Sequence, residues 1–330
     1  MCVEFVTPRR RFLLAAGTAV FSVSRLARSQ SSSRVYRVGY LSSGTLRSPW
    51  VSAMGRRFRE LGYIEGKNFV LESRGLGEHR DKLAETAAEL ARAKPDVAIA
   101  AGSESVLRAL RQTMGTTPIV MVAVDYDPVE KNYIAGLARP GGNITGVYLR
   151  QVESAAKRLE LLKEALPHVT RVAALFDHAT RDQFRAAEEV AAKLGVELVP
   201  QELRGITYDF PAALAAAASA KAQAVLALSS GAFFPLRDRL ISAAHSHRLP
   251  VIANPNYAEA GALVAFGASF SHMYARAAEY ADRILKGAKP AEIPVEQASQ
   301  YDLIVNLKTA KALGLTISQR VLVRATRVIE

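Results

Sequence analysis

Cysteine is almost absent from this chain of 330 residues, since Cys2 is the only one. Cys2 precedes an apolar segment near the N-terminus, so everything after that segment lacks disulfides, thiol nucleophiles and cysteine metal ligands. Cys2 also lies on the wrong side of this segment to carry a lipid anchor. No run approaches the roughly twenty apolar residues that span a bilayer. We therefore expect a soluble mature protein without disulfides.

The common catalytic and cofactor motifs are also absent. The sequence has no H-E-x-x-H, no G-x-G-x-x-G after its first strand, and no G-x-x-x-x-G-K-[ST]. The turn Gly102-Ser103-Glu104-Ser105 lacks the second glycine of a nucleophile elbow. His245 and His247 are two residues apart, which points them away from each other on a helix. We predict no catalytic residue, no metal site and no cofactor.

Charge gives no sign of nucleic-acid binding. The formal net charge is +12, and residues 1–29 contribute five arginines and one acid, so removing them leaves +8. The remaining basic residues alternate with acids on expected helices, as in KRLELLKEAL, instead of forming a basic stripe with aromatics. An anionic ligand is compatible with this balance.

The N-terminus has the organisation of an export signal. Arg9-Arg10-Arg11 precede an uncharged segment of about twelve residues, and Ala27-Arg28-Ser29 has the small-x-small pattern of a cleavage site. Arg9-Arg10-x-Phe12-Leu13 resembles the twin-arginine signal, and an ordinary secretory signal with one extra arginine is the alternative. Both place the protein outside the cytoplasm.

Strand-like and helix-like segments alternate through the chain, beginning near Val35 and starting again near Arg171. The strands are continuous apolar runs, as expected for strands buried on both faces of a parallel sheet. The helices repeat apolar residues at spacings of three and four. We expect an α/β fold of two doubly wound parallel-sheet lobes. The predicted strands are 35–41, 68–74, 96–101, 118–124, 171–176, 196–203, 224–228, 250–253, 262–266 and 303–305. The predicted helices are 48–61, 81–93, 106–113, 153–166, 181–194, 211–220, 236–247, 273–286 and 307–313.

The segment LARPGGNITGV, Leu137–Val147, lies between the two sets of strands. A Pro-Gly-Gly-Asn turn followed by a short β-branched run suits a chain that leaves one lobe and enters another. Two lobes joined by such thin crossovers leave a cleft between them, and we look for function there.

Small polar residues follow the expected strands. Ligands of open parallel sheets bind beyond the carboxyl ends of the strands, where helix N-termini offer free N–H groups to a carboxylate or phosphate. A serine there can equally be a simple helix cap. The strand-end candidates for ligand binding are Ser42, Ser43, Gly102, Ser103, Asp125, Tyr126, Asp127, Asp177, Ser229, Ser230, Asn254 and Asn256. For Asp127, which precedes Pro128, the alternative role is to start a turn.

Aromatic side chains also lie within a few residues of strand ends. They are Trp50, Tyr126, Phe233, Phe234 and Tyr257. Rings from two lobes could stack on an apolar part of a ligand while N–H groups bind its anionic end. Core packing is the alternative for each ring, and we add Phe233 to the predicted ligand-binding residues.

Several blocks together resemble the ABC-transporter substrate-binding family of the bacterial periplasm, in the branch that includes tryptophan- or aromatic-amino-acid-binding proteins. The blocks are LARPGGNITGV, ELGYIEGKNFVLE, RLPVIANPNYAEAGALVAFG, AAEYADRILKGAKPAEIPVEQ and NLKTAKALGLTI. The resemblance covers about residues 35–330. It implies a type I periplasmic-binding-protein fold with a three-crossover hinge. By position it implies ligand contacts at Ser42, Ser43, Gly102, Ser103, Asp127, Ser229 and Ser230.

We expect an export signal at 1–29, a first lobe at 35–145 plus about 260–298, and a second lobe at 146–258 plus about 300–330. Crossovers are expected at 137–147 and near 252–262 and 298–302. The expected function is capture of a small organic solute, bearing a carboxylate and with an amino acid as candidate, for an ABC permease in the inner membrane. We expect a periplasmic monomer. The alternatives are a ligand-presenting sensory protein of the same fold and an exported α/β hydrolase.

Overall fold

The computed structural model describes residues 34–330 other than 78, 125 and 206. The expected export signal, 1–29, and the candidate Asp125 therefore lie outside the described residues. Residues Val35–Glu330 form one compact unit. Among the described residues, no helix combines the length and apolarity needed to cross a bilayer.

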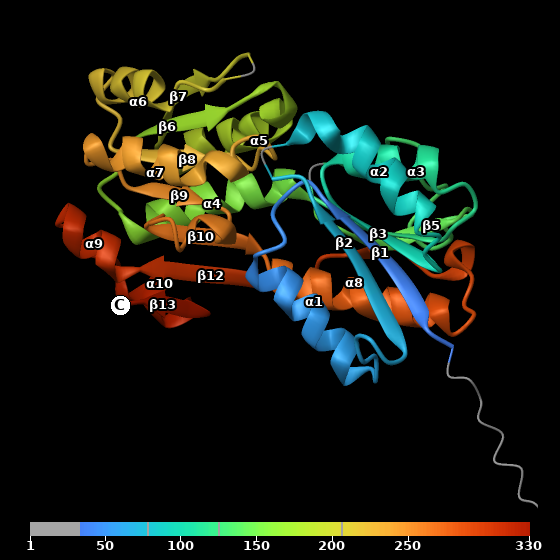
Figure 1. Cartoon of the computed structure of the whole chain (residues 1–330). Helices are drawn as coiled ribbons and strands as arrows, with labels where there is room; N and C mark the ends of the chain where they lie inside the picture. The colour runs from blue at the N-terminus through green and yellow to red at the C-terminus, as the bar shows by residue number, and fades with distance from the viewer. Residues whose placement is uncertain (1–33, 78, 125, 206) are drawn as a thin grey trace, which may run out of the picture. The chain divides into compact units, whose positions relative to one another are not determined.

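The first of two sheets in the described chain has six parallel strands in the order β11-β5-β4-β3-β1-β2. Helices α1 and α8 cover one face, lying side by side in Figure 1, and α2 and α3 cover the other. The strands are β1 (Tyr36–Ser42), β2 (Phe69–Gly75), β3 (Val97–Gly102), β4 (Ile119–Ala123), β5 (Ile144–Tyr148) and β11 (Glu296–Gln297). The helices are α1 (Pro49–Glu60), α2 (Leu83–Arg92), α3 (Glu104–Thr113) and α8 (Phe270–Leu285).

The second sheet has seven strands in the order β13-β12-β10-β9-β8-β6-β7, within the same described residues. All its pairs are parallel except β10 with β12. The strands are β6 (Arg171–Phe176), β7 (Glu197–Glu202), β8 (Ala224–Ala227), β9 (Val251–Ala253), β10 (Val264–Ala268), β12 (Tyr301–Asn306) and β13 (Arg327–Ile329). The helices are α4 (Gln151–Ala165), α5 (Arg181–Ala191), α6 (Phe210–Ser219), α7 (Arg237–Ser246), α9 (Leu307–Leu313) and α10 (Gln319–Arg324).

Short 3₁₀ turns complete the described elements. They are η1 (Arg80–Lys82), η2 (His178–Thr180), η3 (Ala192–Leu194), η4 (Phe234–Leu236), η5 (Pro255–Tyr257) and η6 (Pro290–Glu292). Two of them, η4 and η5, follow strands of the second sheet and carry residues of the site described below.

Local sequence explains the main elements. The run VAIAAG of β3 is buried almost throughout, as expected for a central parallel strand. In α1, the Ser48 side chain accepts a hydrogen bond from the Val51 N–H, and Pro49 occupies the first turn. Met54 and Phe58 then face the core from this helix. The expected alternation of strands and helices is therefore present.

The chain passes between the sheets three times. It leaves the first sheet after β5, returns to it between β10 and α8, and leaves again between β11 and β12. The last passage lies within the expected 298–302. The first two lie later in the sequence than expected, because Ile144–Tyr148 pairs with β4 and Val264–Ala268 pairs with β9.

The boundaries expected near 145 and 260 therefore need correction. The Pro-Gly-Gly-Asn turn returns the chain to the sheet it came from, and the Asn143 side chain ties it there by donating to the carbonyls of Gly115 and Thr117 at 3.1 and 2.8 Å. The β-branched run after it is an interior strand instead of a linker. By sheet membership we propose lobes of 35–148 plus 270–297 and of 151–268 plus 301–329.

Candidate functional site

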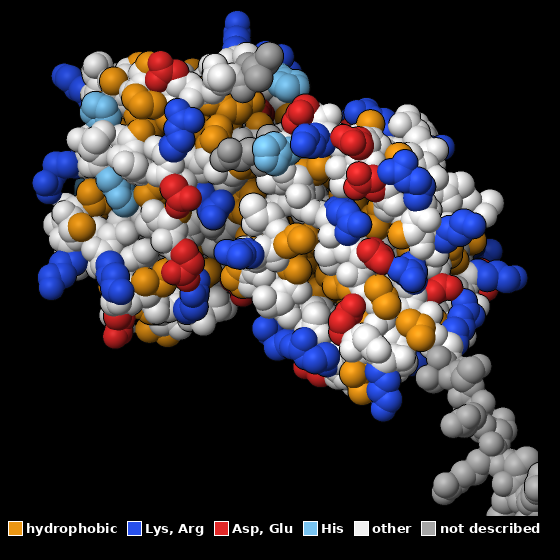
Figure 2. Space-filling model, in the orientation of Figure 1, with side chains coloured by type: hydrophobic (Ala, Val, Ile, Leu, Met, Phe, Trp, Pro, Cys, Tyr) orange, Lys and Arg blue, Asp and Glu red, His pale blue; other side chains and the backbone are white. Residues whose placement is uncertain are grey.

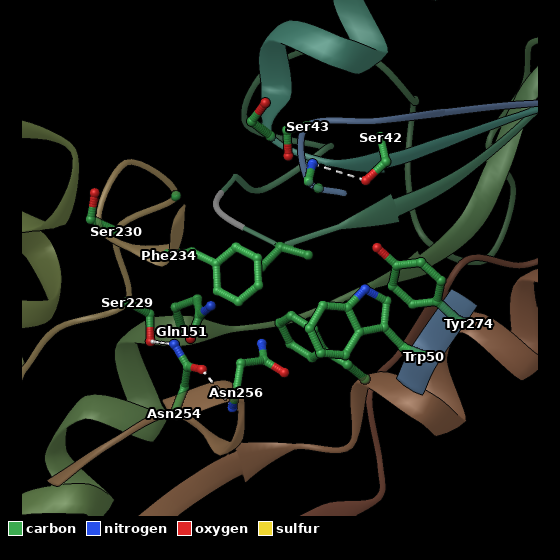
Figure 3. A pocket seen from close by; sticks show the side chains of 16 residues that line it. Ser42, Ser43, Trp50, Gln151, Ser229, Ser230, Phe234, Asn254, Asn256 and Tyr274 are labelled. Carbon is green, nitrogen blue, oxygen red and sulfur yellow. Dashed lines mark hydrogen bonds between the residues drawn. The ribbon is translucent and has the colours of Figure 1, made fainter. Parts of the chain in front are cut away.

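A pocket lies where the carboxyl ends of strands from both sheets meet, as the close-up in Figure 3 shows. The volume of this pocket that is open to the centre of a water molecule is about 60 Å³. A single water needs about 10–15 Å³ by the same measure. Elements of the first sheet contribute Ser42, Ser43, Gly44, Trp50, Gly102, Ser103, Val124, Phe270 and Tyr274. Elements of the second contribute Gln151, Ser229, Ser230, Gly231, Phe234, Asn254 and Asn256.

Tight turns after β1 and β3 form the first-sheet wall. The Ser42 hydroxyl accepts a hydrogen bond from the Gly44 N–H at 3.0 Å. Gly102 has a φ of +101°, and a Cβ at this position would lie 2.3 Å from the Ser43 Oγ. The positive φ therefore favours glycine where these two turns touch, and a side chain there would also force the Ser43 hydroxyl to move. Ser103 precedes α3, and its hydroxyl lies 2.8 Å from that of Ser105.

On the second-sheet wall, hydrogen bonds fix the orientation of the polar groups. The Asn254 side chain accepts from the Asn256 N–H at 3.0 Å and donates to the Ser229 hydroxyl at 3.4 Å. The Ser229 N–H donates to the Gln183 side chain at 3.0 Å. The Ser229 hydroxyl thus accepts from Asn254, which leaves its own proton available to a ligand.

A buried carboxylate lies behind this wall. Asp177 accepts hydrogen bonds from the hydroxyls of Ser230, Thr180 and Tyr208 and from the Ala179 N–H. Its side chain does not line the pocket. Because the Ser230 hydroxyl donates its hydrogen bond to Asp177, it can only accept further hydrogen bonds. It accepts one from the Ala232 N–H. Asp177 therefore orients the wall from behind.

Aromatic rings from both sheets' elements meet at the pocket. The Trp50 ring centroid lies 5.7 Å from that of Phe234 and 5.8 Å from that of Phe270. The Arg237 guanidinium carbon lies 4.7 Å from the centre of the Phe234 ring. These rings also border a larger outer groove of about 840 Å³. They therefore separate the inner pocket from the outer groove.

Two buried phenols, Tyr40 and the pocket-lining Tyr274, have ring centroids 6.4 Å apart. Burial raises the pKa of Tyr40 to about 12, and the Ser42 and Tyr274 hydroxyls offset part of that rise. Burial likewise raises the pKa of Tyr274 well above its ordinary value. Both phenols are neutral near pH 7. The described residues that line the pocket, a set that leaves out residue 125, carry no charged side chain.

The pocket brings together many of the strand-end residues that the sequence singles out. Those that line it are Ser42, Ser43, Gly102, Ser103, Ser229, Ser230, Asn254 and Asn256. They come from turns after β1, β3, β8 and β9. Their contact with a ligand remains a prediction.

Four other candidates do not line the pocket. Tyr126 is buried against Tyr133, with ring centroids 5.9 Å apart. The Asp127 carboxylate accepts from the N–H groups of Val129 and Glu130, as in a turn at Asp-Pro. Asp177 lies behind the wall, as described above.

Phe233 is fully buried in the second-sheet core. Its ring centroid lies 5.0 Å from that of Tyr208 and 5.5 Å from that of Phe210. Its neighbour Phe234 lines the pocket instead. This core packing decides which of the two adjacent rings faces the pocket.

Sequence reasoning did not find Gln151, Phe270 and Tyr274. Gln151 and Phe270 are the first residues of α4 and α8, which begin two and three residues earlier than expected. Both helices start directly after the chain crosses between sheets, which places their first turns beside the pocket. Helices beginning at a crossover are thus the signal that could have located these residues.

No group of three or more His, Cys, Asp or Glu side chains is placed to hold a metal ion in the described part of the chain. On the face shown in Figure 2, basic and acidic side chains are interspersed. The polar pocket with its aromatic rings is therefore the feature to compare with known proteins.

Similarity to solved structures extends over most of the chain. A conserved domain protein from Vibrio cholerae O1 biovar eltor has a TM-score of 0.78 at 27% identity, covering 89% of this chain and 100% of that one. An ABC domain in complex with L-Trp from Streptococcus pneumoniae has a TM-score of 0.78 at 22% identity, with the same coverage. The fold is thus that of periplasmic-binding proteins, with two parallel α/β lobes.

Sequence comparison gives the family. The chain is 25% identical over 273 residues to a tyrosine-binding protein from Clostridioides difficile strain R20291, covering 79% of this chain and 75% of that protein. A family model described as ABC transporter substrate binding protein matches residues 50–329. The chain therefore belongs to the ABC transporter substrate-binding protein family, a family of non-catalytic solute-binding proteins.

Proposed function

We propose that this chain captures a small carboxylate-bearing organic solute, of the aromatic amino-acid class, in the pocket between its sheets and delivers it to an ABC permease. The pocket offers uncharged hydrogen-bonding groups and aromatic rings together. An aromatic amino acid has a ring that can pack against the rings of the pocket, and polar groups that can form hydrogen bonds with its uncharged groups. Family membership removes the alternative of a hydrolase.

One observation carries this proposal: polar strand ends and rings from both sheets line a single pocket (Figure 3). A ligand touching both walls gains all its contacts only when the walls are close together. Its binding then favours the closed arrangement over an open one. The permease would recognise that closed arrangement.

The relatives support the ligand class. The Clostridioides difficile relative is named for tyrosine binding, and the Streptococcus pneumoniae structure holds L-Trp. Both ligands pair an aromatic ring with a carboxylate. We assign the same class to this pocket because Trp50 and Phe234 border it beside the donors of Ser229 and Gln151.

The place of action and the partners follow from the same proposal. We place the chain in the periplasm, as a monomer, with an inner-membrane ABC permease as its partner. The interspersed charges of Figure 2 fit a role without nucleic acid.

Ligand binding can be tested by thermal unfolding and titration calorimetry on the purified chain. L-Tyrosine, L-tryptophan and L-phenylalanine are the probes, with a neutral sugar as control. A ligand at 100 times its Kd stabilises the folded state by about 2.7 kcal/mol, so a bound aromatic amino acid raises the Tm. If no carboxylate-bearing compound changes the Tm or releases heat, the proposed function is wrong.

A further inference from the structure

A buried arginine lies behind the pocket wall without a counter-ion among the residues that the structure describes. Arg158, on α4, is fully buried. Its Nε donates to the Phe266 carbonyl at 2.7 Å, and its Nη2 lies 3.5 Å from the Gln151 Oε1. Its Nη1 has no hydrogen-bond partner in the described part of the chain. No carboxylate of the described residues forms an ion pair with it.

The guanidinium stays charged in this environment. Burial lowers the pKa of Arg158 to about 10, which is still well above neutrality, and Tyr257 opposes the decrease. The Tyr257 hydroxyl is also buried, with no hydrogen-bond partner among the described residues. Leaving a charge buried and unpaired is strongly destabilising. A charge retained at such a cost points to a binding role.

The surrounding backbone is shaped around this arginine. Gly267 on β10 approaches it so closely that an added Cβ would lie 3.3 Å from Nη2 and 3.0 Å from the Pro255 Cδ. Pro255 belongs to η5, whose neighbours Asn254 and Asn256 line the pocket. The guanidinium is therefore held directly behind the second-sheet wall.

Arg158 also determines which end of the Gln151 amide faces the pocket. The two residues are seven apart on one helix, and thus on the same face. A guanidinium has only donors, so Gln151 must turn its Oε1 towards Arg158. Its Nε2 donors are then available to the pocket that Gln151 lines.

We propose that Arg158 is the positioning residue that makes this pocket selective for a carboxylate, which binds at the second-sheet wall beside Gln151. This role of Arg158 rests on the proposed function. It adds the position of the ligand's anionic end and the charge that compensates it. The pocket-lining side chains that the structure describes are uncharged. Among the described residues Arg158 is the buried cation, and it can compensate a bound carboxylate from behind the wall, through Gln151.

The test compares ligands that differ only in the carboxylate. L-Tryptophan and tryptamine form one pair, and L-tyrosine and tyramine form another. Calorimetry gives the ratio of the amine's Kd to the amino acid's Kd for each pair, a ratio that does not depend on the folded fraction. We expect the wild-type chain to prefer the amino acid at least tenfold. Arg158→Met should lower that preference at least tenfold, and Arg158→Lys, which keeps the charge, should largely restore it.

A second variant guards against misfolding of Arg158→Met. Gln151→Glu places a carboxylate next to the guanidinium, so it neutralises the charge and completes an ion pair. It should raise the Tm while losing the preference for the amino acid. Because Gln151→Glu also removes the Nε2 donors, the rise in Tm, which reports the ion pair, is the readout of this variant that is specific to Arg158.

The outcomes separate the two proposals. If neither member of any pair binds to the wild-type chain, the proposed function fails and this assignment fails with it. If both members bind equally, the role of Arg158 is wrong while solute capture stands. The same holds if Arg158→Met and Gln151→Glu keep the wild-type preference.

Discussion

Gly102 shows how one residue sets the shape of the pocket. Its φ of +101° is costly for a side chain, and a Cβ there would clash with the Ser43 hydroxyl. We expect Gly102→Ala to destabilise the chain by about 2–3 kcal/mol in urea unfolding. It should also weaken ligand binding, because Ser43 must move.

Gly62 offers a matched control for that variant. Its φ is +92°, and nothing lies within 4 Å of a Cβ built on it. Gly62→Ala therefore tests backbone strain alone and should cost about 1 kcal/mol with ligand affinity unchanged. Equal effects of the two substitutions on affinity would contradict the role of the Gly102–Ser43 contact.

Tyr40 makes the stability of the chain sensitive to alkaline pH. Its pKa is about 12 in the folded chain, against about 10 for an unperturbed tyrosine. The neutral phenol therefore stabilises the folded state fully below pH 10, and this contribution is lost as pH rises through about 12. A shift of two pKa units corresponds to about 2–3 kcal/mol.

Tyr40→Phe isolates this contribution. Because the Ser42 and Tyr274 hydroxyls near the buried Tyr40 hydroxyl form no hydrogen bond of good geometry with it, its removal should change stability at pH 7 by no more than about 1 kcal/mol. The free energy of unfolding of the variant should then fall less than that of the wild-type chain between pH 10 and 12. Parallel curves over that interval would show that Tyr40 does not titrate as described.

At the scale of elements, the sequence predicts most strands and helices to within a few residues, because buried parallel strands are long apolar runs. It does not reveal β11, β13 or α10, which are short and lack a clear period, nor β5, whose β-branched run it takes for a crossover. The sequence also does not predict that β10 pairs with β12 in antiparallel orientation. That orientation depends on how the chain returns to the second sheet, and the pattern of apolar residues does not indicate it.

The strand-end residues of the site are predictable for a related reason. Parallel strands present their carboxyl ends at one edge of a sheet, so polar turns that follow predicted strands can be identified as candidate site residues from the sequence. The choice between Phe233 and Phe234 is different, since packing against Tyr208 and Phe210 decides it. Gln151 was missed because it belongs to a helix that starts at a crossover.

The contact between α1 and η4 gives a prediction at this scale. Trp50 is the only tryptophan of the chain, so its fluorescence reports on the pocket. Phe234→Ala removes a ring 5.7 Å away and opens the indole to water. We expect a red shift of Trp50 emission and about tenfold weaker binding of L-tyrosine, since such ring contacts contribute about 0.5–1.5 kcal/mol beyond buried area.

Phe184→Ala is the control for that variant. Phe184 stacks on Phe176 with centroids 4.5 Å apart, and neither residue lines the pocket. This substitution should lower stability while leaving Trp50 emission in place. An unchanged emission spectrum in Phe234→Ala would contradict the contact between α1 and η4.

For the whole molecule, the central feature is one pocket lined by residues of two sheets. The chain passes between the sheets three times, and we propose that these passages let the lobes separate and close like a hinge. An open space of about 60 Å³ is small for an aromatic amino acid. We therefore expect the Trp50 and Phe234 rings to part, or the lobes to open, when such a ligand enters through the outer groove.

A crystal structure of the chain grown with L-tyrosine or L-tryptophan tests this account most directly. The account predicts a ligand in contact with both walls at once, with its ring beside Trp50 and Phe234 and its carboxylate beside Gln151. A ligand that touches residues of only one sheet, or that lies away from these strand ends, would contradict it.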